Sequence, residues 1–201
     1  MRTLNSLNAA TEGKRLAIVG AALDCFVEAG YTQATMEKIR DRVGVSNGSL
    51  YHHFKSKEDL AAAVYVEGIR NYQECIAGVV SGDAAAEEGV KEMVRCHLRW
   101  VIENRSWAVF LFRMRHADFM ETAEGSLTEA NSQFFKPLSG WFKMRRAEGA
   151  LRNMPLPIYL SMILGPCQEF SRMWLSSGLE VDVEKAIEEI GDGVWRALGP
   201  V

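Results

Sequence analysis

Gly44 is the residue that most constrains the fold of this chain, because it separates two short segments that both have helical spacing. Thr35 can cap the first helix and Ser46 the second, since a side-chain oxygen at these positions accepts a hydrogen bond from the first turn. Glycine suits the turn between them, which needs a positive φ angle that a Cβ atom disfavours. The residues predicted to face inward are Met36, Ile39, Val43 and Leu50.

The segments on either side of this helix-turn-helix are also predicted to be helical. Upstream, apolar residues recur at helical spacing before a stop at Gly30, namely Leu16, Val19, Leu23 and Phe26. Downstream, the sequence from Ser56 to Asp59 is similar to a capping box that opens a long helix. Helices are expected near 57–80, 85–104, 106–115, 122–147, 156–177 and 183–197. No stretch alternates with the period of a strand, so we predict an all-α fold of about nine helices.

The charge of the chain is unevenly distributed. The formal net charge is −3, yet the window from Lys38 to Lys57 holds five basic residues and one acidic residue, Asp41. A basic window on a mildly acidic protein is typical of a surface that binds nucleic-acid phosphates.

No stretch approaches the roughly 20 apolar residues of a membrane span, and the N-terminus lacks a secretory signal. We therefore expect no membrane partner and a cytoplasmic location.

The four cysteines are predicted to be buried reduced thiols. They have no C-x-x-C spacing and are Cys25, Cys75, Cys96 and Cys167. We therefore expect no disulfide, no metal site and no cofactor.

The sequence has no P-loop, H-E-x-x-H or nucleophile-elbow signature, so we expect that the chain is not an enzyme. A helical enzyme without a linear signature is the alternative.

The segment TMEKIRDRVGVSNGSLYHHFKSKEDL, from Thr35 to Leu60, resembles the signature of the tetracycline-repressor (TetR) family. Two positions depart from the family pattern, which has a small residue at Arg40 and alanine at Val43. The resemblance implies a helix-turn-helix DNA-binding domain at 13–56 after a flexible arm at 1–12. A helical ligand-binding and dimerisation domain is then expected at 57–201. The matching residues are Gly44, Val45, Ser46, Gly48, Tyr51, His53, Phe54, Lys57, Glu58 and Leu60.

The resemblance and the side-chain chemistry together predict ten residues that bind operator DNA: Thr35, Arg42, Ser46, Asn47, Gly48, Ser49, Tyr51, His52, His53 and Lys57. The exposed positions of the second short helix, Asn47, Ser49 and His52, are expected to read base edges, with Arg42 at the flank. The others are expected to bind phosphates or to approach the backbone. The alternative is that Tyr51 or His53 packs inward against the first helix.

A homodimer is expected, because one recognition helix covers only a few base pairs. The resemblance places the dimer interface on the helices near 156–177 and 183–197. A stripe in this region has suitable spacing and consists of Leu179, Val183, Ile187, Ile190 and Val194. The same stripe could instead pack on its own subunit.

The resemblance also implies a pocket in the helical body for a small apolar or amphipathic ligand. Aromatic, methionine and isolated polar side chains are the candidates: His97, Trp100, Phe110, Met114, Phe134, Trp141, Met162 and Gln168. They could instead be plain core residues. The sequence thus predicts a homodimeric repressor that a ligand releases from a palindromic operator. The alternatives are a DNA-binding adaptor that recruits a protein partner without sensing a ligand, and an activator.

Overall fold

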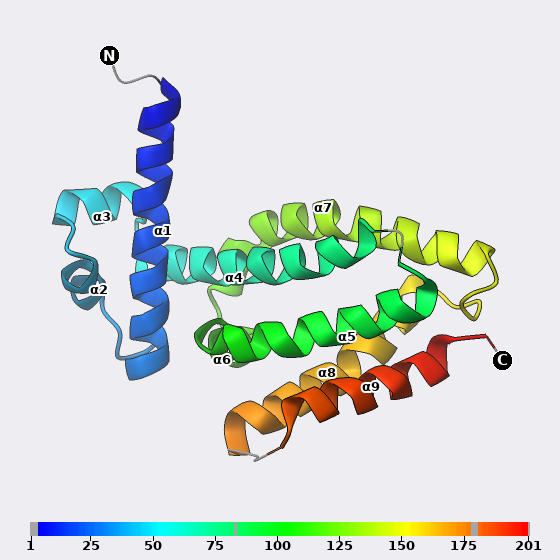
Figure 1. Cartoon of the computed structure of the whole chain (residues 1–201). Helices are drawn as coiled ribbons and strands as arrows, with labels where there is room; N and C mark the ends of the chain where they lie inside the picture. The colour runs from blue at the N-terminus through cyan, green and yellow to red at the C-terminus, as the bar shows by residue number, and fades with distance from the viewer. Residues whose placement is uncertain (1–3, 83, 178–180, 201) are drawn as a thin grey trace. The chain divides into compact units, whose positions relative to one another are not determined.

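The computed structural model describes residues 4–82, 84–177 and 181–200, and within them the chain forms nine α-helices and no strand (Figure 1). This result confirms the predicted all-α fold. The first helix starts at Leu4, so residues 4–12 are helical where we expected a flexible arm. The helices are α1 (Leu4–Ala29), α2 (Met36–Val43), α3 (Asn47–His53), α4 (Lys57–Val80), α5 (Ala86–Glu103), α6 (Arg105–Met114), α7 (Met120–Ala147), α8 (Leu156–Ser177) and α9 (Val183–Leu198).

The helix-turn-helix forms through the caps that the sequence predicted. Thr35 Oγ1 accepts a hydrogen bond from the backbone N–H of Lys38 at 3.3 Å, which caps α2. The α2 helix ends at Gly44, whose φ of 71° lies in the left-handed region that favours glycine. Ser46 Oγ then accepts from the backbone N–H of Ser49 at 3.2 Å and starts α3. Local capping therefore fixes where both short helices begin.

The described part of the chain divides into two compact units, and α4 and α7 each contribute to both. The first unit comprises the described residues up to Ile69 together with Ser106–Leu127. Its core contains the stacked rings of Phe26 and Phe110, whose centroids are 5.5 Å apart. The domain boundary that the sequence predicts between residues 56 and 57 separates a DNA-binding domain from a ligand-binding domain. It is defined by function and not by packing, so it stays a prediction.

The buried stripe of α1 starts later than the sequence predicted. Ile18, Val19 and Phe26 are buried, but the Leu16 residue that we expected to face inward is 42% exposed. None of residues 9–17 is buried, so this stretch of α1 contributes no buried side chain to the core. Of the residues predicted to face inward from α2, Val43 is only half-buried.

The second unit comprises Arg70–Arg105 and the described residues from Thr128 onward. In it α5 packs against α8 and α9, and α8 packs against α9 (Figure 1). Ile187 and Val194 of α9 are 3% and 4% exposed in the single chain, so for these two the alternative of packing within the subunit holds. Leu179, the first member of the predicted stripe, lies outside the described residues.

The cysteines correct one expectation from the sequence. Cys75 of α4 and Cys96 of α5 form a disulfide, so the prediction of reduced thiols is wrong for this pair. Their spacing of 21 residues gave no signal, because the pairing depends on the register in which α4 and α5 pack. Cys25 and Cys167 are free and buried, as predicted.

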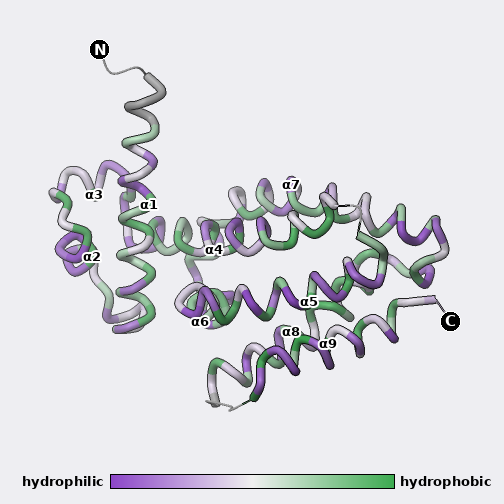
Figure 2. The backbone as a smooth tube through the Cα atoms, in the orientation of Figure 1, coloured by the Kyte–Doolittle hydropathy of each residue, from purple (hydrophilic) through white to green (hydrophobic). Residues whose placement is uncertain are grey.

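Hydrophobic and hydrophilic residues are interspersed along the described helices (Figure 2). None of these helices combines the length and the apolar character needed to cross a membrane.

Gly89 of α5 faces the indole of Trp141, and this contact yields a prediction. A Cβ atom at Gly89 would overlap Trp141 Cζ2 and lie 3.0 Å from Trp141 Cη2. Replacing Gly89 with alanine is therefore expected to destabilise the protein by about 1–3 kcal/mol, the usual cost of overpacking. The matched control is Gly140→Ala on α7, where no atom lies within 4 Å of the new Cβ. For this control, urea unfolding curves should show a free energy of unfolding up to about 1 kcal/mol above that of the wild type. Equal unfolding midpoints for the two variants would contradict the prediction.

Candidate nucleic-acid interface and ligand site

The recognition helix α3 presents a polar face to solvent and an apolar residue to the core. Asn47 and His52 are exposed, and the Tyr51 side chain is 43% exposed. Ser49 is half-buried, while Leu50 on the opposite face is completely buried. Because α3 is capped and anchored by Leu50, its exposed side chains project from a fixed backbone, which is the arrangement that groove reading requires.

Gly48 lies on the exposed surface of α3, and no atom would come within 4 Å of a Cβ added there. Packing inside the described part of the chain therefore does not require glycine at this position. Glycine in the interior of a helix costs about 1 kcal/mol relative to alanine. A close approach of DNA backbone or base, as the sequence predicted, would account for it.

Lys57 is held at the start of α4 by Tyr31. Its Nζ donates a hydrogen bond to the Tyr31 carbonyl at 3.1 Å and lies 4.5 Å from the centroid of the Tyr31 ring. Burial, and then the neighbouring Glu58 carboxylate, raise the pKa of Tyr31 to about 12, so the phenol stays protonated. The lysine is thus oriented before any phosphate arrives, which lowers the entropic cost of a phosphate contact.

Arg42 is exposed but already has a partner. Its Nη2 donates to both carboxylate oxygens of Glu28 at 2.8 Å. A contact with DNA at the flank of the site would therefore require Arg42 to exchange Glu28 for a phosphate or base. Because the ion pair is on the surface, its net contribution is small and the exchange is energetically accessible.

His53 differs from the other predicted DNA-binding residues because it is half-buried and has an altered pKa. Burial, followed by the charges of His52 and Arg15, lowers the pKa of its imidazole. The sequence left open whether Tyr51 or His53 packs inward. Of the two, His53 lies inward, near charged residues of α1, whereas Tyr51 remains exposed.

The residues predicted to form a ligand pocket do not all lie in the same unit. Phe110 and Met114 belong to the core of the first unit. The other six belong to the second unit, where they differ in burial: His97, Trp100 and Trp141 are buried, Phe134 and Met162 are half-buried, and Gln168 is exposed.

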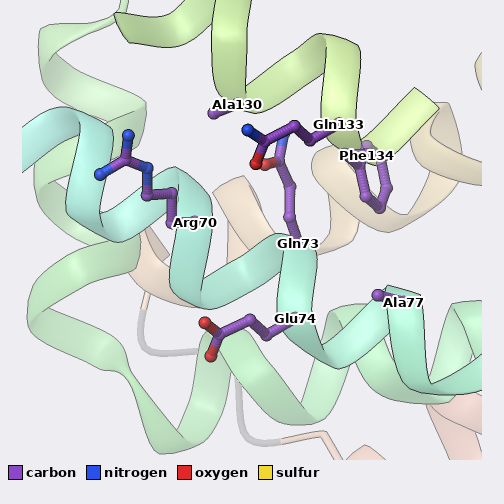
Figure 3. A pocket seen from close by; sticks show the side chains of 7 residues that line it. All are labelled: Arg70, Gln73, Glu74, Ala77, Ala130, Gln133 and Phe134. Carbon is purple, nitrogen blue, oxygen red and sulfur yellow. The ribbon is translucent and has the colours of Figure 1, made fainter. Parts of the chain in front are cut away.

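Phe134, one of the predicted pocket residues, lines an open pocket of about 280 Å³ between α4 and α7 (Figure 3). Gln73 Nε2 is held by a hydrogen bond of 2.8 Å to Asn131 Oδ1. Sequence reasoning missed most of the lining, because polar residues at spacings of three and four on α4 resemble an ordinary solvated face. The lining residues are Arg70, Gln73, Glu74, Ala77, Ala130, Gln133 and Phe134.

A polar cluster lies where α4 meets α5, and its His97 and Trp100 are buried while Tyr72 is half-buried and Asn71 is exposed. The Tyr72 hydroxyl and His97 Nδ1 are hydrogen-bonded at 2.9 Å, and Trp100 Nε1 donates to Asn71 Oδ1 at 2.7 Å. Burial lowers the pKa of His97 to about 4, so its imidazole is neutral at physiological pH. Burial, and secondarily Cys167 of α8, raise the pKa of Tyr72. The cluster is therefore uncharged.

Four buried polar side-chain atoms of the second unit have no hydrogen-bond partner among the described residues: His97 Nε2, Trp141 Nε1, Arg145 Nε and Ser171 Oγ. Ser171 lies one helical turn after Cys167, the α8 residue close to Tyr72. An unpaired buried polar group costs about 1–3 kcal/mol, and such groups are rare in native proteins, so each one calls for a partner or a reason. Polar groups of a bound molecule, such as a carbonyl, carboxyl or hydroxyl group, could satisfy His97 Nε2 and Ser171 Oγ.

Comparison with known proteins agrees with this geometry. The family of bacterial regulatory proteins called the tetR family matches residues 18–64, which include α2, α3 and the start of α4. The "Fatty acid metabolism regulator protein" of Bacillus subtilis is 22% identical over 171 residues, which cover 85% of this chain and 88% of that protein.

Solved structures share the fold over almost the whole chain. A TetR family regulator from Marinobacter aquaeolei VT8 superposes with a TM-score of 0.79 at 18% identity, over 96% of this chain and 100% of that one. The regulator FadR from Bacillus subtilis, solved in complex with stearoyl-CoA, superposes with a TM-score of 0.75 at 20% identity, over 89% and 96% of the two chains. The exposed, capped recognition helix, the family match and the shared fold lead to one conclusion: this chain is a DNA-binding transcriptional regulator of the tetR family.

Proposed function

We propose that this regulator is a homodimeric repressor, which leaves a palindromic operator when a small amphipathic ligand binds its second unit. The observation that carries the ligand part of the proposal is that two of the four unpartnered buried atoms, His97 Nε2 and Ser171 Oγ, belong to uncharged side chains near Tyr72 and Cys167. A ligand that binds them would favour one conformation of the second unit through differential affinity. The protein would act in the cytoplasm, on chromosomal DNA.

A long-chain acyl thioester is the first candidate for the ligand. Its carbonyl oxygen can accept a hydrogen bond in an uncharged apolar site, and its chain would lie among apolar side chains. The similar Bacillus subtilis regulator bound to stearoyl-CoA makes this class the natural one to test.

The second candidate function is that of an adaptor that recruits a protein partner without sensing a ligand. The modest volume of the open pocket, about 280 Å³, favours this alternative.

The dimer would use the exposed face of α8 rather than the buried stripe of α9. Ile158 of α8 is 46% exposed, and Met173 on the same helix and Val181 just before α9 are also exposed. Burying large apolar side chains of this kind is the usual source of stability in homodimer interfaces. Replacing Ile158 with glutamate should therefore shift the protein toward monomers in sedimentation equilibrium.

The DNA part of the proposal predicts different effects for two substitutions on the predicted interface. Asn47→Ala should relax base preference at one operator position, because a bidentate contact to adenine contributes about 1–3 kcal/mol of discrimination. Lys57→Ala should weaken binding to every duplex and lower the slope of log affinity against log salt by about one. Duplexes selected from a random pool, measured by fluorescence anisotropy at two salt concentrations, supply both readouts. Wild-type specificity and slope in both variants would contradict the prediction.

The ligand part is tested by adding stearoyl-CoA to the complex with a selected duplex. We expect DNA affinity to fall by about 5-fold to 150-fold, the usual range of allosteric coupling. Coenzyme A without an acyl chain is the control and should have no effect. If stearoyl-CoA leaves DNA affinity unchanged, the adaptor function gains support over acyl sensing.

A further inference from the structure

The disulfide of the second unit lies inside the contact that contains the polar cluster. Cys75 of α4 and Cys96 of α5 have Cα atoms 6.1 Å apart, within the usual range for a disulfide. Cys96 directly precedes His97, and Cys75 follows Tyr72 by one helical turn. The covalent link thus joins α4 to α5 next to the hydrogen bond between Tyr72 and His97.

The paired cysteines differ from the two free ones in their access to solvent. Cys75 and Cys96 are half-buried, whereas Cys25 and Cys167 are buried. Burial also raises the pKa of the Cys167 thiol to about 12, which keeps it protonated and unreactive. A small oxidant in solution would therefore reach the pair and not the free thiols.

We propose that Cys75 and Cys96 are a reversible redox pair, oxidised by low-molecular-weight disulfides and reduced by dithiols. The inference rests on the proposed function for its location, since cytoplasmic disulfides are usually transient and redox-sensing. In the forward direction one cysteine thiolate attacks the small disulfide and releases one thiol. The second cysteine then attacks the mixed disulfide and releases another thiol, so two protein thiols and one small disulfide become one protein disulfide and two small thiols.

The link would act on ligand response because α4 runs without interruption from Lys57, next to the recognition helix, to Val80. Any ligand signal that moves α4 relative to α5 is blocked when Cys75 and Cys96 are joined. The oxidised protein should therefore keep its DNA affinity in the presence of ligand. The reduced protein should lose affinity when ligand binds.

The thiol chemistry is tested on the full-length protein, reduced with dithiothreitol and then treated with glutathione disulfide. The chain has four cysteines. The number of them that reacts with a thiol reagent in denaturant should fall by two on oxidation and return to four on reduction. The Cys25→Ser/Cys167→Ser variant should lose both of its remaining thiols in the same treatment. If all thiols persist in the wild type, or if Cys25 and Cys167 are the ones lost, the redox pair is wrong.

The functional consequence is tested with a selected duplex and stearoyl-CoA. In the reduced wild type the acyl-CoA should weaken DNA binding about tenfold, within the usual range of coupling, and in the oxidised protein by less than about twofold. Cys75→Ser should respond as the reduced protein does under both conditions. If the oxidised and the reduced wild type respond equally to stearoyl-CoA, the disulfide does not control the response to ligand, and that part of the proposal is wrong. A reduced protein that ignores stearoyl-CoA would instead contradict the proposed ligand, and the thiol count would still decide whether the pair is redox-active.

Discussion

Replacing Leu50 with alanine is expected to abolish DNA binding, although Leu50 touches no DNA in the proposed interface. Leu50 is 0% exposed and is the buried anchor of α3 in the first unit. Removing a fully buried leucine side chain costs about 2–5 kcal/mol, through lost burial and the cavity left behind. A loss of this size is a large part of the stability of an ordinary domain. The recognition helix should therefore lose its fixed position.

The matched control for Leu50→Ala is the next residue on the same helix. Tyr51 is 43% exposed, so Tyr51→Ala should change the free energy of unfolding by no more than about 0.5 kcal/mol. It should nevertheless weaken DNA binding, because a predicted phosphate contact is lost. Urea unfolding and duplex anisotropy on both variants separate the two effects. A stable Leu50→Ala protein, or a Tyr51→Ala protein with wild-type DNA affinity, would show that the two faces of α3 have been misassigned.

The features that the sequence predicted correctly depend on neighbouring residues. The caps at Thr35 and Ser46 and the turn at Gly44 follow from side-chain oxygens and a positive φ angle. These interactions act within one or two helical turns. The residues that decide them are therefore close together in the sequence, and the recognition helix can be located from its own residues and their immediate neighbours.

The features that the sequence did not predict depend on how distant helices pack. The disulfide between Cys75 and Cys96 requires one register between α4 and α5. The open pocket requires polar residues of α4 to face Phe134 of α7. Leu16 has the right spacing for a core residue, but none of residues 9–17 of α1 is buried. Periodicity indicates which face of a helix is apolar, and it does not indicate what that face meets.

His97 is expected to make the second unit sensitive to acid. Burial lowers the pKa of its imidazole from 6.5 to about 4 in the folded protein. Between these values the unfolded chain binds a proton that the folded protein does not, so stability falls as the pH falls. The contribution is fully present above about pH 6.5 and is lost toward about pH 4, with a total loss of about 3 kcal/mol from this group.

Two variants isolate the contribution of His97 from that of the carboxylates. His97→Gln removes the titrating imidazole, so its free energy of unfolding should depend on pH less steeply than that of the wild type. Tyr72→Phe removes the hydroxyl bound to Nδ1 and keeps the imidazole buried, so it should retain the steep dependence, because burial is the cause of the shift. Urea unfolding between about pH 7 and about pH 4 measures both.

The same measurement bears on the ligand site, since the proposed site needs a neutral buried imidazole with one nitrogen unpartnered. If His97→Gln and the wild type lose stability equally as the pH falls, His97 gains its charge without cost in the folded protein. Water would then already hydrate Nε2, and no ligand carbonyl would be needed to satisfy it. If the wild type alone shows the steep loss, the imidazole is buried and dry. A ligand that accepts a hydrogen bond from Nε2 should then stabilise the neutral folded state by mass action, so it should raise the free energy of unfolding near pH 7 and lower the pKa of His97 further, and the loss of stability toward about pH 4 should not become smaller.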